Sequence, residues 1–485
     1  MAVSASLPRA PKSSARRVRI ALLAAYLHDE YEWEIFRGAC EAMDEVGGTV
    51  VCFAGAGLGD PDPSHQARQF VFDLVSAHSV DAVLSISSVL GHVVGPSEIG
   101  TWLRRYGLPV AGIGPAHGVP SVQVSDAAGT ARLVEHLILH HAHRRIAFLS
   151  GPATNVEAQH RLSGYSRALD EHGLDYDTKL VLHGQFTRES GVHAVHELFD
   201  RRQVRVSEVD AIVAANDYMA FGVIDELVRR RIGVPEQVAV VGFDDIAPAR
   251  SHEPRLTTVR QPLRELGREG VRKLLSMLNG STSERTTSLD TELVLRRSCG
   301  CTPTEIPAAP PWGAESLRPF ESELPEPQTE LPLVGTEHAL DLHDDLVYER
   351  LYRFQRALGN RMFGPTVELS TVLAEHLPEL GVNECAVSEF SNKANKDSLR
   401  LSFGFDAENL RPQHAVFAAK ELFPNAFSHL RSSSIVVLPV THGEQALGVA
   451  ALPASIPSGQ LCEILAESFG VALKSIELRR RADSK

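Results

Sequence analysis

Short apolar runs alternate with amphipathic stretches over about the first 250 residues of the chain. Stretches with apolar residues at helical spacing, such as 131–141 and 217–230, lie between the apolar runs. Apolar runs without polar alternation, joined by helices, are typical of parallel strands covered on both faces, so an α/β domain is expected. The predicted strands are 18–26, 49–55, 81–87, 108–114, 119–125, 145–151, 179–186, 210–216 and 238–243.

The last part of the chain has a different pattern. Its apolar runs predict antiparallel strands, and residues 459–481 predict a closing helix, so a smaller α+β domain is expected. Residues 301–337 are rich in Pro and Glu and lack periodicity, which predicts a linker between the two parts. The predicted antiparallel strands are 384–390, 398–405, 434–440 and 446–454.

An apolar stripe follows the predicted linker and has two interpretations. It is either one face of a helix packed on its own domain or the seam of a dimeric coiled coil. The dimer hypothesis predicts a homodimer in which the closing helix contributes to the same interface. The stripe consists of Leu340, Val347, Leu351, Phe354 and Leu358, and the face of the closing helix consists of Leu461, Ile464, Leu465 and Phe469.

Composition narrows the classes of partner. The chain carries a formal net charge of −13, which disfavours a broad phosphate-binding surface, because nucleic-acid affinity rests largely on Lys and Arg. No apolar run approaches the roughly 18 residues that a membrane helix needs, so no membrane contact is expected. Six cysteines are scattered over the chain, and most lie in apolar contexts, which indicates a reducing, cytoplasmic location.

Signals for metal binding and catalysis are weak. Cys299 and Cys301 form an isolated C-x-C pair, and His136 and His140 are one helical turn apart, but no Glu completes a zinc motif. The chain contains no G-x-S-x-G elbow and no Walker A lysine motif. We therefore expect no metal site, no cofactor and no enzymatic activity; the role of the cysteine pair is left open.

Polar residues follow several predicted strands. Asp244 and Asp245 end one strand, Asn216 follows another, and Arg161 lies in the first turns of the helix after 145–151. Open parallel sheets bind ligands at the carboxyl ends of their strands. A sugar or nucleoside presents hydroxyls that both donate and accept hydrogen bonds. Asp244 offers acceptors, Asn216 offers a donor and an acceptor, and Arg161 offers a fork of donors, so together they match such a molecule. Asp245 is predicted to hold the loop.

Some of these residues also have a capping interpretation. Asp217 is predicted to cap the helix that begins there, whereas for Asn216 capping and ligand binding stay open. Thr154 and Glu157 have the spacing of a capping box at the start of the helix that carries Arg161.

Four ordered motifs resemble one family. "HRRIAFLSGP", "RLSGYSRAL", "ANDYMAFG" and "VVGFDDIAPARSHEPRLTTVRQP" are similar to the sensor domain of the lactose/galactose repressor (LacI/GalR) family. The resemblance implies a two-lobed, type I periplasmic-binding-protein-like fold over about 17–300. It places ligand contacts on Arg161, Asn216, Asp244 and Gln261. Tyr31 and Glu32 occupy the position where related sugar binders have an aromatic pair.

The "RRSCGC" and "VVLPVTHGEQALGVAAL" stretches look more like bacterial sensors in which this domain precedes a GAF-like module and a diguanylate cyclase or histidine kinase. The expected division is an arm at 1–16, a sensor domain at 17–300, the linker at 301–337 and a helix plus GAF-like domain at 338–485. Only 16 residues precede the first strand, so direct DNA binding is not expected.

The resulting prediction is a non-enzymatic sensor of a small polar ligand, signalling by lobe closure and dimer contacts to an unknown output protein. Two alternatives stay open. One is a LacI/GalR-like transcriptional regulator that acts on DNA directly or through a partner. The other is a truncated diguanylate cyclase or kinase sensor.

Overall fold

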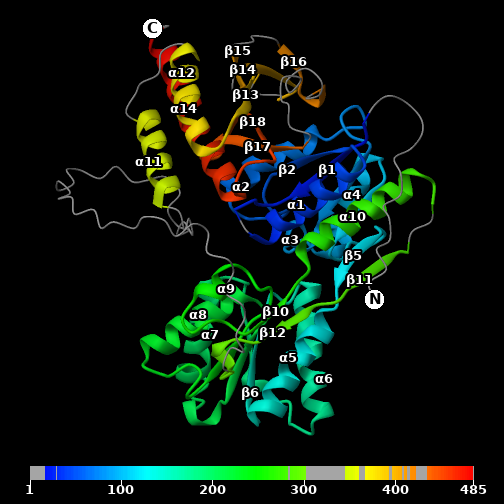
Figure 1. Cartoon of the computed structure of the whole chain (residues 1–485), viewed down its shortest axis with the longest axis vertical. Helices are drawn as coiled ribbons and strands as arrows, with labels where there is room; N and C mark the ends of the chain where they lie inside the picture. Colours follow the sequence, from blue (N-terminus) through cyan, green and yellow to red (C-terminus); the bar gives the residue numbers. More distant parts are fainter. Residues whose placement is uncertain are drawn as a thin grey trace, which may run out of the picture.

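The computed structural model describes residues 17–28, 30–281, 284–301, 345–359, 366–392, 396–406, 409–411, 416–421 and 434–483. The predicted arm at 1–16 and the predicted linker, apart from its first residue, lie outside these ranges. Within them, the chain forms a two-lobed α/β body, and the C-terminal elements lie against one of the lobes (Figure 1).

Lobe 1 contains parallel strands in the order β11-β5-β4-β3-β1-β2. Helices α1 and α10 pack beside each other on this sheet (Figure 1). All residues of β3 are buried, as expected for a strand covered on both faces. The elements are β1 (Arg19–Ala24), α1 (Glu30–Glu45), β2 (Thr49–Ala54), α2 (Pro63–Arg68), η1 (Gln69–Leu74), β3 (Ala82–Ile86), α3 (Ser87–Leu90), α4 (Gly95–Leu103), η2 (Arg104–Tyr106), β4 (Val110–Ile113), β5 (Ser121–Val124), α10 (Leu263–Leu278) and β11 (Thr286–Leu289).

Lobe 2 contains a second parallel sheet in the order β7-β6-β8-β9, and a short antiparallel pair, β10 and β12. The chain passes between the lobes after β5, after β10 and after β11. The elements are α5 (Asp126–His141), β6 (Ile146–Ser150), α6 (Val156–Glu171), η3 (Thr178–Leu180), β7 (Val181–His183), α7 (Arg188–Val195), η4 (His196–Arg201), η5 (Val206–Glu208), β8 (Ala211–Ala214), α8 (Asp217–Arg229), β9 (Ala239–Val241), α9 (Pro248–Ser251), β10 (Thr258–Arg260), β12 (Glu292–Val294) and η6 (Arg297–Cys299).

Each apolar run that predicts a parallel strand contains one of β1 to β9, so these predictions and the two-lobed α/β architecture are confirmed. The runs are long enough, and apolar enough on both faces, to be distinguished from the helices between them. Among the described residues, no helix combines the length and hydropathy that a membrane span requires.

The C-terminal unit, residues 345–483, pairs its strands antiparallel, as the alternating pattern predicts. One of these strands also has a parallel neighbour: β17 pairs with β2 of lobe 1, with Val436 opposite Cys52. A single sheet of 12 strands therefore runs through lobe 1 and the C-terminal unit. The elements are α11 (Asp345–Gly359), α12 (Thr366–His376), η7 (Pro378–Leu380), β13 (Glu384–Phe390), β14 (Ser398–Asp406), β15 (Asn409–Arg411), β16 (Val416–Ala418), η8 (Ala419–Glu421), β17 (Ile435–His442), β18 (Gln445–Pro453) and α14 (Gly459–Asp483).

The apolar stripe on α11 packs within its own chain. Leu351, Phe354 and Leu358 are 2%, 0% and 4% exposed and belong to one core cluster with residues of α12 and α14. Leu461, Leu465 and Phe469 of α14 are buried in the same cluster. The interpretation of these side chains as a dimer seam is therefore wrong, and packing on the helix's own unit is correct. Leu340 and the side chain of Val347 lie outside the described part.

Candidate functional site

The candidate site lies between the two lobes, where loops and helix starts follow the strands of both sheets. Tyr31 in the first turn of α1 and Ser88 after β3 come from lobe 1. Arg161 on α6 and Asp244 after β9 come from lobe 2. This is the position expected for a ligand site in parallel α/β sheets.

Arg161 is the central charged group of lobe 2 and is 4% exposed. Its Nε donates to Asp126 Oδ1 at 2.7 Å, and its Nη1 donates to the Ala215 carbonyl at 2.6 Å. Asp244 Oδ1 lies 3.7 Å from Nη1, and the guanidinium carbon lies 3.9 Å from the centroid of the Phe243 ring. Burial opposes the charge, but the neighbouring carboxylates outweigh it and raise the pKa of Arg161. The guanidinium is therefore a fixed cation with a fixed orientation.

Asp244 has a strained backbone, with φ at 126°, a region that residues with a β-carbon rarely adopt. Its Oδ1 accepts a hydrogen bond of 2.7 Å from Gln261 Nε2. Gln261 is 5% exposed, and its Oε1 has no hydrogen-bond partner among the described residues. A buried acceptor without a partner is costly, so Gln261 Oε1 is suited to receive a ligand donor. Strain of this kind is often retained at functional sites.

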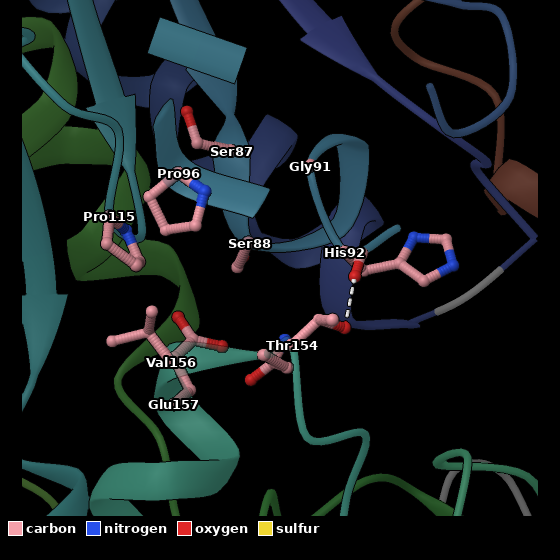
Figure 2. A pocket seen from close by; sticks show the side chains of 10 residues that line it. Ser87, Ser88, Gly91, His92, Pro96, Pro115, Thr154, Val156 and Glu157 are labelled. Carbon is pink, nitrogen blue, oxygen red and sulfur yellow. Dashed lines mark hydrogen bonds between the residues drawn. The ribbon is translucent and has the colours of Figure 1, made fainter. Parts of the chain in front are cut away.

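Figure 2 shows the narrow pocket that both lobes bound in this structure. The Thr154 hydroxyl bridges the lobes by donating to the His92 carbonyl at 3.2 Å. The Tyr31 hydroxyl lies 3.4 Å from Ser88 Oγ, so hydroxyls of α1 and α3 meet at the lobe 1 wall. The lining residues are Ser87, Ser88, Gly91, His92, Pro96 and Pro115 of lobe 1 and Thr154, Asn155, Val156 and Glu157 of lobe 2.

The electrostatics of the site favour neutral, hydrogen-bonding groups. Burial, with Asp126 nearby, raises the pKa of Glu157 to about 8, although Arg161 opposes the shift. Burial and then the charge of Glu157 raise the pKa of Tyr31 well above its ordinary value. Near neutral pH the site thus combines protonated Tyr31 and Glu157 with the guanidinium cation of Arg161. This set offers donors and acceptors but no nucleophile paired with a base.

Asn216 has the capping role, one of the two left open by the sequence, and Asp217 has a role other than the predicted one. Asn216 is the N-cap of α8: its Oδ1 accepts from the Met219 amide at 3.0 Å, and its Nδ2 donates to the Phe186 carbonyl at 3.0 Å. With both polar atoms bonded, the geometry does not support the predicted ligand contact. Asp217 is not the cap; its carboxylate accepts from the Thr258 hydroxyl and the Ile246 amide. The capping prediction for Asp217 is wrong because the residue before it already has the extended backbone of an N-cap.

Glu32 holds the loop at the end of β1. Its two carboxylate oxygens accept the amides of Ala25 and Tyr26, each at 2.8 Å, and the residue is 1% exposed. The structure therefore separates Glu32 from its neighbour Tyr31: the first orders the loop and the second reaches the pocket wall.

The predicted capping box on α6 is also wrong. Asn155 is the N-cap and accepts from the Ala158 amide at 2.8 Å. Thr154 and Glu157 are freed from capping and line the pocket instead. Asp126, at the start of α5, is a site residue that the sequence interpretation missed; its position after an apolar run is the same signal that identified Asp244.

Asp245 has the structural role predicted for it. Its carboxylate meets Arg260 at 2.7 Å and Arg296 at 2.6 Å. These pairs hold the loop after β9 against β10 and the segment after β12, and they fix the backbone that presents Asp244.

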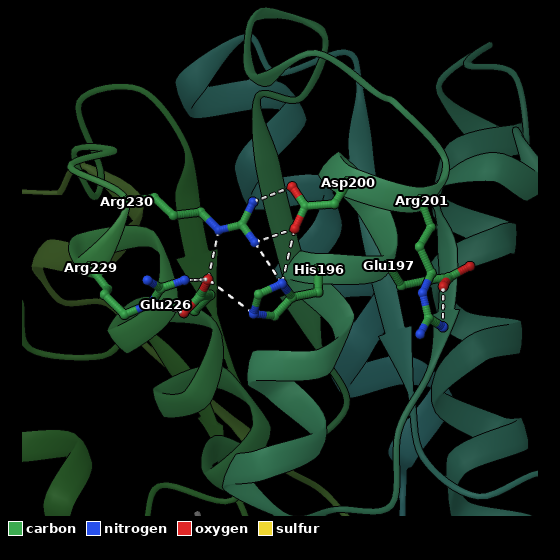
Figure 3. A network of polar contacts seen from close by, with 7 residues as sticks. All are labelled: His196, Glu197, Asp200, Arg201, Glu226, Arg229 and Arg230. Carbon is green, nitrogen blue, oxygen red and sulfur yellow. Dashed lines mark hydrogen bonds and ion pairs between the residues drawn. The ribbon is translucent and has the colours of Figure 1, made fainter.

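A separate polar network lies at the other end of α8, away from Asn216 (Figure 3). Glu226 is 3% exposed and accepts from Arg229 and Arg230, and Arg230 also donates to Asp200. Hydrogen bonds from Arg229, followed by those from Arg230, lower the pKa of Glu226 to about 2. Each of these side chains is bonded to a protein partner, so the network joins η4 to α8.

Comparison with known proteins identifies the type of α/β domain that the two lobes form. Residues 134–299 match the family described as periplasmic binding protein-like domain. The chain is 41% identical over 201 residues to the HTH-type transcriptional regulator CelR of Thermobifida fusca, covering 40% of this chain and 58% of that protein. It is 37% identical over 161 residues to the HTH-type transcriptional regulator AscG of Escherichia coli (strain K12), covering 33% of this chain and 47% of that protein. The chain thus spans about half the length of these curated relatives.

The solved structure of the transcriptional regulator CelR–cellobiose complex is 31% identical, with a TM-score of 0.50, over 58% of this chain and 85% of that chain. The fold and the cleft define a protein of the periplasmic-binding-protein-like class. Within that class, the chain contains a sensor domain of the LacI/GalR type, as the sequence motifs predicted. Its curated relatives are transcriptional regulators rather than enzymes.

Proposed function

We propose that this chain is the ligand-sensing part of a transcriptional regulator and that its cleft binds a neutral saccharide. The observation that carries the proposal is the arrangement of Arg161, Asp126, Asp244 and Gln261 at the cleft, with Gln261 Oε1 buried and unpartnered within the described ranges. Such a site binds hydroxyls and rejects analogues that lack them, because its buried groups would otherwise stay unpaired.

The charge of the site supports a neutral ligand over an anionic one. Arg161 is already bonded to Asp126 and the Ala215 carbonyl and lies 3.7 Å from Asp244. Its charge is therefore already balanced by two carboxylates, which also repel anions, whereas its remaining N–H groups can still donate to hydroxyls. The relative whose solved complex contains cellobiose is similar over the sensor domain, which supports a glucoside as the first ligand to test.

The structure provides a contact route from the cleft to the C-terminal unit. Glu463 of α14 accepts from the Leu27 amide at 3.1 Å, in the loop that leads from β1 into α1. At the start of α1, Glu30 accepts from the Ala247 amide of lobe 2 at 2.5 Å. The loop thus contacts both lobe 2 and the C-terminal unit, and a change in lobe spacing would move it. We propose that the unit is GAF-like and receives the signal by this route.

Calorimetry of the whole chain tests the ligand proposal. Cellobiose, galactose and ribose are titrated, with adenosine as the nucleoside arm and a sugar phosphate as the anionic arm. Arg161→Met should abolish saccharide binding, whereas Arg167→Met, an exposed arginine on the same helix, should leave it unchanged. Binding only of the sugar phosphate, or equal loss in both variants, would contradict the proposal.

Gel-shift titrations with promoter fragments at several salt concentrations test whether the chain acts on DNA. A shift with a preference over random DNA, weakening with salt, indicates that the chain acts on DNA directly. A shift only after addition of a second protein indicates action through a partner. A homodimer remains part of the proposal, but through a surface other than the buried stripe on α11.

A further inference from the structure

Four potential metal ligands meet on lobe 2, at the end of α5 away from the cleft. His136 and His141 come from α5, and Cys299 and Cys301 come from the segment after β12. Their ligand atoms all lie within 4.8 Å of one another. The sequence presents the halves of this cluster more than 150 residues apart, and neither half is a motif by itself.

The distances match the edges of a tetrahedron around one ion. His136 Nε2 and His141 Nε2 are 3.2 Å apart, Cys301 Sγ lies 3.4 Å from each of them, and Cys299 Sγ lies 3.7 Å from His136 Nε2. An ion about 2.1 Å from each nitrogen and about 2.3 Å from each sulfur would set neighbouring ligands roughly 3.4–3.8 Å apart. The cluster therefore needs little adjustment to surround a metal ion.

Local backbone geometry brings the four groups together. Helix α5 ends at His141, because Ala142 adopts a left-handed conformation with φ at 56°. Gly300, between the two cysteines, has φ at 98°, which a residue with a β-carbon rarely adopts, and this turn lets both sulfurs face α5. Cys299 is 1% exposed and belongs to the lobe 2 core, so the site is anchored in the protein interior.

We propose that His136, His141, Cys299 and Cys301 bind a structural Zn²⁺ ion. Two Cys and two His in a closed tetrahedral set form a common structural zinc site, and thiolate with imidazole favours Zn²⁺ over oxygen-preferring ions. Two thiolates balance the charge of the ion, so the buried site is neutral. The ion fastens the last described segment of the sensor domain, 297–301, to α5. The first residue of that helix, Asp126, binds Arg161 in the cleft.

Metal analysis of the whole chain, purified without chelators, tests the site. We expect one Zn²⁺ per chain, and Co²⁺ exchanged into the protein should give visible bands of a tetrahedral ion with thiolate ligands. Cys301→Ser and His136→Gln should each weaken Zn²⁺ binding by at least about tenfold, since even outer groups around a metal ion contribute that much. Zn²⁺ should raise the melting temperature of the wild type but not of Cys301→Ser.

His140→Gln is the matched control. His140 is exposed and stacks on the His136 ring with centroids 5.0 Å apart, but it is not one of the four ligands. This variant should keep its Zn²⁺. A protein without metal that gives no Co²⁺ spectrum, a Cys299–Cys301 disulfide in its place, or equal loss in the control would overturn the proposal. None of these results bears on saccharide binding, which calorimetry measures at the other end of α5.

Discussion

The junction between α14 and lobe 1 depends on one buried carboxylate, that of Glu463. Its Oε2 pairs with Arg68 Nη2 at 2.5 Å, and its Oε1 accepts from the Leu27 amide. The side chains of Arg68 and Glu463 are only 11% and 7% exposed. At the start of the same helix, a β-carbon on Gly459 would lie 1.8 Å from the Leu27 carbonyl oxygen, so the helix touches the loop directly. We predict that Glu463→Gln destabilises this junction strongly.

The size of the effect follows from what the substitution leaves behind. Glutamine keeps an acceptor for Leu27 but removes the charge that balances the buried guanidinium of Arg68. Breaking a buried ion pair by removing one partner costs about 3–5 kcal/mol. The Tyr26 ring, 5.9 Å from the guanidinium carbon, and the charge of Glu467 still favour the Arg68 cation. We therefore expect Glu463→Gln to lower the free energy of unfolding by about 3 kcal/mol, near the lower end of this range.

Urea denaturation and hydrogen exchange of the whole chain measure this effect. In a double-mutant cycle, Arg68→Met combined with Glu463→Gln should recover most of the lost unfolding free energy, because no unpaired charge remains. Arg481→Ala, on the same helix, is the control: its side chain is 68% exposed, and the change should cost less than about 0.5 kcal/mol. If Glu463→Gln costs no more than the control and leaves exchange at the Leu27 amide unchanged, the reasoning is refuted.

Four further outcomes are expected. Asp244→Ala should weaken saccharide binding by roughly 1.5–3 kcal/mol in calorimetry, and unchanged affinity would argue against a ligand contact. Burial raises the pKa of Glu157 to about 8, so the folded protein favours the protonated carboxyl. The resulting contribution to stability is fully present below pH 4.5, the ordinary pKa of Glu, and is lost as the pH rises through 8. Urea titrations should therefore show Glu157→Gln gaining stability over the wild type between pH 5 and 8. The pKa of Glu226, about 2, has the opposite sign: Glu226→Gln should lose roughly 1–2 kcal/mol at pH 7, and the deficit should shrink as pH falls below 4.5 towards 2. Leu351→Glu with Phe354→Glu should unfold the C-terminal unit, because it buries two charges, and circular dichroism measures the loss of structure. A variant that stays folded but changes from dimer to monomer would instead support the dimer interpretation of the stripe.

The parallel strands could be predicted because a strand buried on both faces is apolar at every position, a local property of the sequence. The partner of each strand is not local. Nothing in 435–442 distinguishes a strand that adds to its own antiparallel neighbours from one that also pairs with β2. The stripe on α11 has the same limitation, since an apolar helix face looks alike whether its own chain or a second copy covers it.

The candidate site, too, could be predicted from the sequence only in part. Arg161, Asp244 and Gln261 could be predicted from their positions and from the family motifs, and the structure brings them together. Asn216 could not be assigned, because an N-cap and a ligand-binding amide need the same residue type in the same place. The cysteine and histidine cluster was missed because each half is too weak a signal until the fold joins them.

The pairing of β17 with β2 also decides how the chain can be divided. A sheet edge presents unpaired amide and carbonyl groups that readily recruit another strand, and an apolar edge of this kind aggregates. Cutting after residue 301 would expose such an edge on β2, whose residues from Val50 to Ala54 are fully buried. The isolated sensor domain should therefore be prone to edge-to-edge association, and β17 of the C-terminal unit protects it by covering this edge.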